Sequence, residues 1–132
     1  MLATALAVTV AVAGSWSGTV ADRTGEAGDP PLDDRRITLV ISADGKRGTL
    51  TDRGSVIEPD RPGCRNPLVF RLRRADGTTV FRTGNGPSSR GSSCIGGSIV
   101  RVRKRSDGRL SFREQCSTTD EDCYLFGTLR RR

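Results

Sequence analysis

Side chains capable of acid–base catalysis are present in this sequence, but their spacing matches no catalytic pattern. The two acidic clusters are Asp33 with Asp34, and residues 120–122. A carboxyl pair acts as acid and base only when the groups are held at a fixed separation and one pKa is raised. Both clusters fall in predicted loops with no apolar wall, and residues 120–122 lack the alternating ligands of a calcium loop. We therefore interpret both as solvated loop charge.

Activated nucleophiles and phosphate-binding loops are also missing. The chain contains no histidine, which excludes His-based triads, His-ligated metals and His-based pH switches. No serine lies in a G-x-S-x-G motif. Gly84 and Gly86 are followed by Pro87 instead of a helix, so the dinucleotide and Walker loops are absent. The sequence therefore predicts no catalytic residue, no metal and no cofactor, and we expect a protein that is not an enzyme.

Arginine is the residue type that remains for a function. The net charge is +7, and 20 of the 22 basic residues are arginine. Residues 61–132 carry a net charge of +10, whereas residues 1–60 carry −3. A surface with this excess attracts polyanions through its long-range electric field.

Alternation along the predicted strands gathers several arginines into one band, because residues i and i+2 of a strand share a face. The side chains of this band either solvate the outer face or bind an anionic ligand, such as nucleic acid, a cell-wall polymer or an anionic lipid surface. Phe81 is the main aromatic residue near the band, so base stacking is weak and sequence-specific binding of nucleic acid is not expected. The members of the band are Arg71, Arg73, Arg82, Arg101, Arg103 and Arg113.

Four cysteines predict two disulfides in this small chain. Their spacing contains no C-x-x-C pair of the kind that holds structural zinc, and three disulfide connectivities are open. Only 34% of the residues are hydrophobic, so cross-links that contribute about 2–4 kcal/mol each would compensate for a small core. The cysteines are Cys64, Cys94, Cys116 and Cys123.

The elements that must position these residues are short strands. Asp-Gly dipeptides separate three of the strand pairs, at 44–45, 76–77 and 107–108, and Asp-Gly between alternating segments is a strong hairpin signal. We predict an all-β fold, an eight-stranded antiparallel up-and-down meander closed as a small barrel, with a β-sandwich as the alternative. The eight strands are predicted at 15–21, 36–42, 47–52, 68–73, 78–83, 98–104, 109–114 and 123–130.

The interior of such a barrel can hold one small ligand or be filled by its own side chains. The predicted interior residues are Trp16, Ile37, Leu39, Leu68, Phe70 and Leu72.

Residues 1–13 have the pattern of a remnant of a signal peptide or membrane anchor. Ala11, Val12 and Ala13 form an A-x-A cleavage pattern before Gly14. The alternative is a genuine first strand, against which the high alanine content weighs. We therefore expect residues 14–132 to form a single β-barrel domain. We also expect an extracellular or cell-surface location, where disulfides persist.

The two ends of the predicted barrel resemble those of lipocalin-like and avidin-like barrels. In those proteins a tryptophan in a G-x-W motif of the first strand packs under a basic side chain from the last strand. Residues 14–16 are Gly-Ser-Trp, and residues 129–131 are Leu-Arg-Arg. The resemblance implies that Trp16 and Arg130 close the barrel together.

A second pattern, spread over residues 15–130, is similar to small exported domains of actinobacteria. It includes Cys64, Phe81 with Arg82, and residues 94–98. Those domains occur alone after a signal peptide or as the extracellular part of serine/threonine kinase chains; their function is largely unassigned, and the resemblance suggests a sensory or ligand-binding role. The resemblance implies that Cys64 pairs with Cys94, which leaves Cys116 and Cys123 as a local pair. No kinase motif is present, so kinase activity is not implied.

Three functional hypotheses follow from the sequence. The first is a non-catalytic, exported ligand-binding or sensory module built on a disulfide-stapled β-barrel. The second is a polyanion-binding protein that uses the arginine band. The third is a small secreted interaction or inhibitor protein that presents residues 84–94 or 116–123. The partner is thus expected to be a small ligand, an anionic polymer or another protein, and contact with a membrane is expected only through an upstream anchor.

Overall fold

The computed structural model describes residues 10–23, 32–55, 63–87, 93–116 and 124–132, and the regular elements in these segments are all β-strands. Two short strands, β6 (Gly86–Pro87) and β7 (Ser93–Cys94), pair with each other in a stretch that the sequence predicted as a loop. The long strands are β1 (Gly14–Arg23), β2 (Leu32–Ile41), β3 (Arg47–Ser55), β4 (Cys64–Arg73), β5 (Thr79–Thr83), β8 (Ile99–Lys104), β9 (Leu110–Gln115) and β10 (Tyr124–Arg131).

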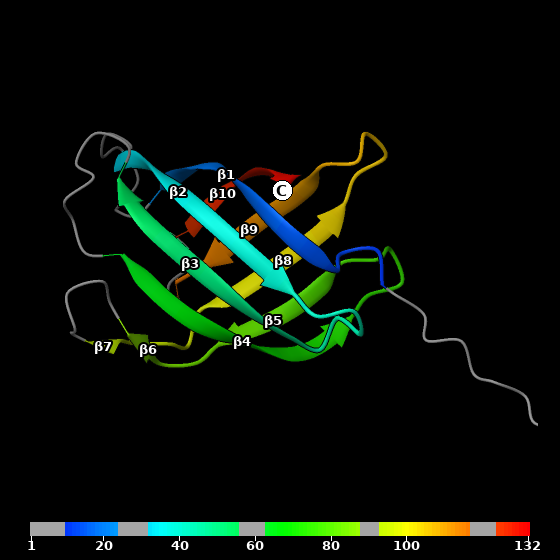
Figure 1. The fold of residues 1–132 in the computed structure, drawn as a ribbon, viewed down its shortest axis with the longest axis horizontal. Helices are drawn as coiled ribbons and strands as arrows, with labels where there is room; N and C mark the ends of the chain where they lie inside the picture. Colours follow the sequence, from blue (N-terminus) through cyan, green and yellow to red (C-terminus); the bar gives the residue numbers. More distant parts are fainter. Residues whose placement is uncertain (1–9, 24–31, 56–62, 88–92, 117–123) are drawn as a thin grey trace, which may run out of the picture.

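The eight long strands form a closed barrel in the order β1-β10-β9-β8-β5-β4-β3-β2 (Figure 1). Each of these strands pairs antiparallel with two neighbours, and the pairing of β1 with β10 closes the ring. This confirms the predicted eight-stranded up-and-down barrel. The β-sandwich alternative is wrong, because the first and last strands pair and leave no open edge between two sheets.

The three Asp-Gly dipeptides form hairpin turns at one end of the barrel. At each turn the aspartate Oδ1 accepts a hydrogen bond from the backbone N–H two residues later, at 2.9–3.0 Å. The glycine that follows has a positive φ, and no other residue type among the described residues does so. The turns are therefore longer hairpin loops with one left-handed residue, not the type I′ turn, in which both central residues have positive φ. The glycines are Gly45 (φ 73°), Gly77 (φ 88°) and Gly108 (φ 84°).

Apolar side chains fill the barrel at this end. Phe81 is fully buried and packs edge to face with Phe70, with ring centroids 6.4 Å apart. Four of the predicted interior residues are buried, namely Trp16, Ile37, Leu39 and Leu68. The prediction that Leu72 lies in the interior is wrong, because its side chain is 47% exposed. A β-bulge between Phe70 and Leu72 shifts the β4–β5 register, so that Leu72 pairs with outward-facing Val80.

Trp16 closes the apolar end of the barrel. Its side chain is fully buried, and the indole Nε1–H donates to the carbonyl oxygen of Val12 at 3.0 Å. The guanidinium of Arg131 lies 4.4 Å from the centroid of the indole ring, which is cation–π geometry. Nη1 of Arg131 also donates to the carbonyl oxygen of Ala13 at 3.1 Å. The closure is therefore a stack of backbone, indole and guanidinium.

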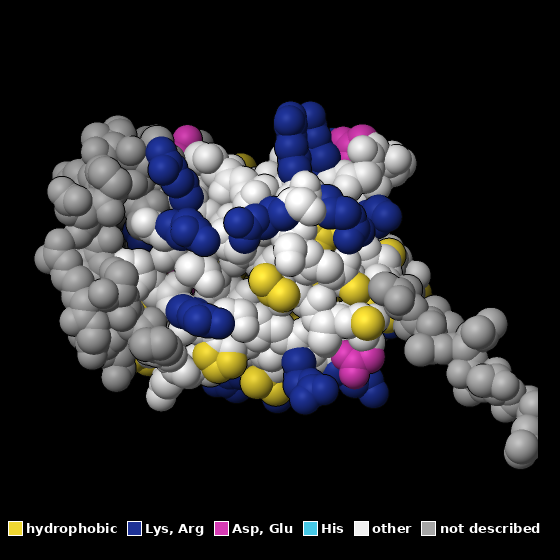
Figure 2. Space-filling view, viewed as in Figure 1, with side chains coloured by type: hydrophobic (Ala, Val, Ile, Leu, Met, Phe, Trp, Pro, Cys, Tyr) yellow, Lys and Arg dark blue, Asp and Glu magenta, His cyan; other side chains and the backbone are white. Residues whose placement is uncertain are grey.

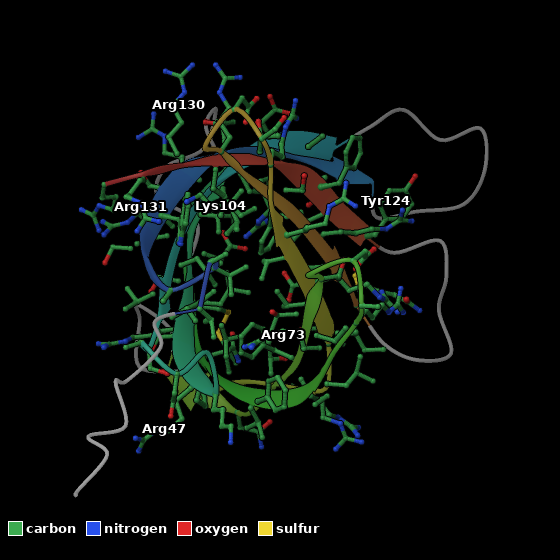
Figure 3. The ribbon with its side chains drawn as sticks, turned by 90° about the vertical axis from the view of Figure 1, so that its right-hand side faces the viewer. Arg47, Arg73, Lys104, Tyr124, Arg130 and Arg131 are labelled. Carbon is green, nitrogen blue, oxygen red and sulfur yellow. A yellow bond between two sulfur atoms is a disulfide. The ribbon has the colours of Figure 1, made fainter. Side chains whose placement is uncertain are left out.

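Arg130 was expected to cover Trp16, but this prediction is wrong by one position, because Arg131 covers the indole ring. In the β1–β10 register Trp16 pairs with Arg131, whereas Arg130 pairs with Ser17. Because successive residues of a strand face opposite sides, Arg130 points away from the barrel (Figure 3). The implied Trp–Arg closure is present, with Arg131 in the basic role.

The folded unit begins before the boundary expected from the sequence. Val12 and Ala13 are 2% and 5% exposed, and Val12 belongs to the hydrophobic core. The backbone N–H of Val10 donates to the carbonyl oxygen of Ala43 at 3.0 Å. The described part of the domain thus starts at Val10 instead of Gly14. Residues 1–9 lie outside the described residues, and their role as a signal or anchor stays a prediction.

Replacing Gly77 tests the left-handed turn without a steric effect. A Cβ at Gly77 would meet nothing within 4 Å, so Gly77→Ala should cost only the backbone strain of a left-handed alanine, about 1–2 kcal/mol in the free energy of unfolding. Gly77→Asn should cost less, because asparagine tolerates this conformation. Urea unfolding of the two variants measures the difference. Equal losses would contradict the conformational explanation.

Shortening the chain tests the packing of residues 10–13. A chain that begins at Gly14 loses the buried Val12 side chain and the acceptor of the Trp16 indole. We expect it to unfold with a free energy about 2 kcal/mol or more below that of a chain beginning at Val10. Chemical unfolding of both forms, followed by tryptophan fluorescence, gives the comparison. If the two chains were equally stable, residues 10–13 would not be part of the folded unit.

Candidate functional site: the polar mouth of the barrel

The barrel interior changes from apolar to polar along its axis. At the end opposite the Asp-Gly turns, the face that carries the apolar core continues into charged side chains on β1, β2, β3 and β9. Asn66, Thr83 and Ser98, all buried, continue the polar layer around the rest of the ring. We call the following residues the polar mouth: Asp22, Arg35, Asp52, Asn66, Thr83, Ser98 and Glu114.

Arg35 joins two carboxylates of the mouth. Its Nε donates to Asp52 Oδ2 at 2.7 Å, and its Nη1 lies 3.8 Å from Asp22 Oδ2. The register of β2 shifts against β1 beside Asp22 and against β3 beside Arg35. Bulges at the rim of a barrel re-aim side chains, and these two place the guanidinium between the carboxylates. Arg35 and Asp52 are 22% and 18% exposed in their side chains, so the pair is only partly shielded from solvent.

Glu114 lies on β9 and is held by a chain of hydroxyl groups. The Ser98 hydroxyl donates to Glu114 Oε2 at 2.6 Å. The Thr83 and Ser98 hydroxyl oxygens are 2.7 Å apart, and Thr83 is the donor there because the Ser98 hydrogen points to Glu114. The backbone N–H of Ser98 in turn donates to Thr83 Oγ1 at 3.0 Å. This network fixes the position of the Glu114 carboxyl.

Burial raises the pKa of Glu114 above its ordinary value. The hydrogen bond from Ser98 opposes this shift, the carboxylate of Asp52 adds to it, and the guanidinium of Arg35 opposes it. The net direction is upward. Glu114 therefore keeps its proton at a pH where an ordinary glutamate has lost it.

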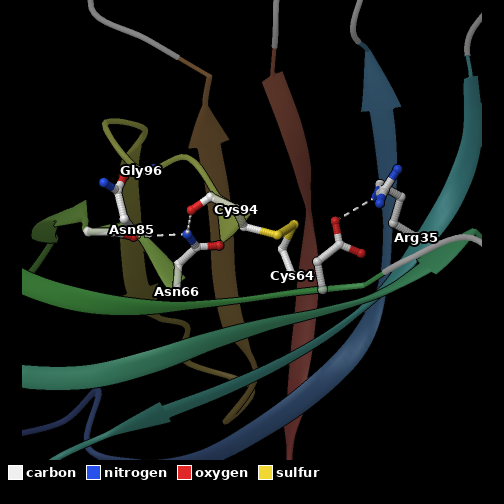
Figure 4. Close-up of a disulfide and its surroundings, with 8 residues drawn as sticks. Arg35, Cys64, Asn66, Asn85, Cys94 and Gly96 are labelled. Carbon is white, nitrogen blue, oxygen red and sulfur yellow. Dashed lines mark hydrogen bonds and ion pairs between the residues drawn. A yellow bond between two sulfur atoms is a disulfide. The ribbon is translucent and has the colours of Figure 1, made fainter. Parts of the chain in front are cut away.

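A disulfide fixes the rim of the mouth on the side of β4. Cys64 at the start of β4 is bonded to Cys94 in β7, with the Cα atoms 5.7 Å apart. The side-chain amide of Asn66 donates to the carbonyl oxygens of Gly84 (2.8 Å) and Cys94 (3.3 Å) and so ties the same two segments together (Figure 4). The implied Cys64–Cys94 pairing is confirmed. Cys116 is also disulfide-bonded, and Cys123 lies outside the described residues.

Among the described residues, the mouth combines the carboxyl groups of Asp22, Asp52 and Glu114 with the guanidinium of Arg35. Among the described residues, no three Asp, Glu or Cys side chains are grouped closely enough to hold a metal ion. The mouth offers carboxyl oxygens as hydrogen-bond acceptors, together with hydroxyl and amide groups on its other side. Such a set of groups can bind a small polar ligand that supplies donors and positive charge.

The arginines of the predicted band occupy several places on the outside. Arg82, Arg101 and Arg113 lie on adjacent strands, and Arg101 pairs directly with Arg113. The expectation that Arg71 and Arg73 share a face is wrong, because the β4 bulge separates them. Arg73 pairs with Thr79 and its Nε donates to Thr79 Oγ1 at 3.4 Å, so that it lies within the ring of strands at the closed end (Figure 3).

Some arginines of the band have intramolecular contacts. Arg113 lies over the ring of Tyr124, 4.5 Å from its centroid, and Arg103 forms an exposed pair with Asp76 at 3.7 Å. Basic side chains are also spread over the face that carries β2 and β3 (Figure 2). Positive charge is therefore not confined to the band.

Sequence reasoning missed the polar mouth. It singled out runs of acidic residues, but Asp33 and Asp34 lie in β2, with Asp34 exposed, and residues 120–122 lie outside the described residues. The alternation of inward and outward residues along each strand could have revealed the mouth, because Trp16, Val20 and Asp22 share one face of β1. In an antiparallel meander, following each apolar face to the strand end would have brought Asp22, Arg35, Asp52 and Glu114 to the same rim.

Comparison with models of known protein families gave no match, and a search of curated proteins gave none either. The described residues also form no helix that is long and apolar enough to cross a membrane.

The raised pKa of Glu114 predicts how stability depends on pH. The folded protein keeps the Glu114 proton at pH values where the unfolded chain has released it, so stability falls as pH rises through this window. Glu114→Gln carries no such penalty. We expect its free energy of unfolding to exceed that of the natural chain at neutral pH, with the difference vanishing in acid, as measured by urea unfolding at a series of pH values.

Asp44 provides a control of opposite sign. A hydrogen bond from Ser42, then one from the backbone of Lys46, lowers the pKa of this exposed carboxyl. Asp44→Asn should therefore lose stability relative to the natural chain as pH rises. A Glu114→Gln difference that is independent of pH would contradict a buried, proton-holding carboxyl.

Proposed function

We propose that this chain is a non-catalytic, exported ligand-binding module whose polar mouth takes a small ligand with a positively charged, hydrogen-bond-donating group. The observation that carries the proposal is the polarity of the interior. One end is sealed by Trp16, Val12 and Arg131, whereas the other ends in a ring of charged and polar side chains.

Closing this end of the barrel with polar side chains costs more free energy than closing it with apolar side chains would. Desolvating a carboxyl is unfavourable unless a partner compensates, and burial indeed raises the pKa of Glu114. The opposite end shows that this barrel can be closed around a mainly apolar interior, with Val12 and Trp16 buried beneath Arg131. Where a protein buries polar groups although apolar ones would fit, the lost stability commonly accompanies a functional site.

The charges of the mouth favour a cation. Among the described residues, the mouth holds the carboxyl groups of Asp22, Asp52 and Glu114 around the guanidinium of Arg35, which pairs with Asp52 and lies 3.8 Å from Asp22. An ammonium or guanidinium group entering the mouth would donate to carboxylate oxygens, and such charge-assisted hydrogen bonds are stronger than neutral ones.

Export is supported by the disulfide. The Cys64–Cys94 bond is compatible with an oxidising environment. The alternative of a secreted inhibitor rests on residues 84–94 and 116–123, of which 88–92 and 117–123 lie outside the described residues. That alternative stays a prediction from the sequence.

Binding of a charge-matched pair of probes tests the proposal. We expect n-butylammonium to bind the full chain with one-to-one stoichiometry and n-butyrate not to bind, as measured by calorimetry. Asp52→Asn should weaken binding of the ammonium about tenfold or more, because a hydrogen bond to a charged group contributes about 1.5–3 kcal/mol. Asp107→Asn, at an Asp-Gly turn on the other end, removes the same charge and should leave the affinity unchanged.

Three results would contradict the proposal. Equal binding of butyrate would remove the charge argument, and equal effects of the two variants would place the ligand elsewhere. Chemical turnover of a bound ester or glycoside in the mouth would make Glu114 and its neighbours an active site and overturn a non-catalytic role.

A further inference from the structure

A groove of about 230 Å³ lies on the outer wall of the barrel over β4, β5 and β8. Apolar side chains from all three strands line it, namely Leu72, Val80 and Ile99. Arginines from the same strands surround them, namely Arg71, Arg82 and Arg101. The groove is separate from the polar mouth, because these residues face outward whereas the mouth lies inside the barrel.

Strand register explains the alternation of apolar and basic side chains along the groove. Val80 pairs with Leu72 on one side and with Arg101 on the other. One step along the strands, Arg82 pairs with Val69 and with Ile99. Each row across the three strands thus contains one arginine and two apolar residues.

Part of the apolar and basic lining of the groove is exposed, whereas Val80 is buried and half-buried Arg101 donates to Gln115 Oε1 at 3.4 Å. Leu72 is 47% exposed and neighbouring Val69 is 55% exposed. No acidic side chain lines the groove, and within the described part of the chain Arg71 and Arg82 have no ion-pair partner. The wall therefore combines uncompensated positive charge with exposed hydrocarbon.

We propose that this groove docks the protein on an anionic phospholipid surface, with the arginines on the phosphate groups and Leu72 and Val69 in the apolar boundary beneath them. Basic residues beside an anionic leaflet and apolar side chains at the headgroup boundary are the two components of interfacial binding. Arginine suits this place because its planar guanidinium binds phosphate in a bidentate manner.

The composition of the wall favours lipid over nucleic acid. Binding of single-stranded nucleic acid relies on aromatic side chains that stack on bases, and Phe81, the only aromatic residue lining the groove, is fully buried. The apolar groups that are exposed are aliphatic. This inference does not depend on the proposed function of the mouth, and it adds a direct membrane contact to the upstream anchor expected from the sequence.

Two triple variants with the same change in charge test the docking. The groove variant replaces Arg71, Arg82 and Arg101 with serine. The control variant replaces Arg36, Arg47 and Arg53, which are exposed on β2 and β3, with serine as well. Flotation of the full chain with vesicles of phosphatidylcholine and phosphatidylglycerol, and with vesicles of phosphatidylcholine alone, measures partition. Thermal unfolding of each variant checks the fold.

We expect binding only to the anionic vesicles. The groove variant should lose about a hundredfold in partition, since each basic residue near an anionic surface contributes about fivefold. The control variant should lose much less. Leu72→Ser should also weaken partition, whereas Val40→Ser, at a similarly exposed position of β2, should not.

Equal losses in the two triple variants would overturn the proposal in favour of a general charge effect. Equal binding to neutral vesicles would overturn the electrostatic part. If a single-stranded oligonucleotide bound more tightly than the vesicles and showed the same dependence on the groove arginines, the wall would be a nucleic-acid surface instead.

Discussion

The closure of the barrel around Trp16 is the interaction on which the rest of the structure depends. The indole has no exposed surface, its N–H is satisfied by the carbonyl oxygen of Val12, and its face is covered by Arg131. These contacts bring together the segment before β1, the first strand and the last strand, which are the parts that must meet if the meander is to close. In a chain with so few large apolar side chains, one fully buried tryptophan supplies a large share of the apolar packing.

Once the ring is closed, alternate residues of each strand face inward, except where a bulge shifts the register. At the sealed end this constraint is met by aliphatic and aromatic side chains. At the other end it brings Asp22, Arg35, Asp52 and Glu114 together, although they are far apart in the sequence. The polar network of Thr83, Ser98 and Glu114 and the disulfide to Cys94 keep this rim ordered. A binding site at the mouth of a barrel needs such a rigid rim, because groups that are already positioned lose less conformational entropy on binding.

The outside of the barrel follows the same alternation. Arginines and aliphatic residues share the outer faces of β4, β5 and β8 because the inner faces are already committed to the core. A molecule of this design could hold a ligand inside and contact a charged surface through its wall. The two proposed sites are separated by the sheet itself, so a substitution in one makes no direct contact with the other.

Much of the fold was predictable from the sequence, since the Asp-Gly turns and the apolar alternation define eight strands and their order. The implied pairing of Cys64 with Cys94 and the Trp–Arg closure were also correct in kind. The errors come from single-residue shifts: the β4 bulge moves Leu72 outward and Arg73 to the barrel end, and the β1–β10 register selects Arg131 over Arg130. Such shifts are set by cross-strand packing, which no local pattern encodes. The mouth was missed because its residues are isolated polar positions at strand ends, and only the closed ring makes them neighbours.

Proton release on ligand binding tests most directly the claim that the mouth is a binding site organised around a buried carboxyl. A cation bound in the mouth favours the ionised form of Glu114, so binding should expel its proton. Calorimetry of n-butylammonium binding in buffers of different ionisation enthalpy counts the protons released. We expect proton release when the natural chain binds below the raised pKa of Glu114, and none when Glu114→Gln binds. Binding without proton release, or equal release by Glu114→Gln, would contradict it.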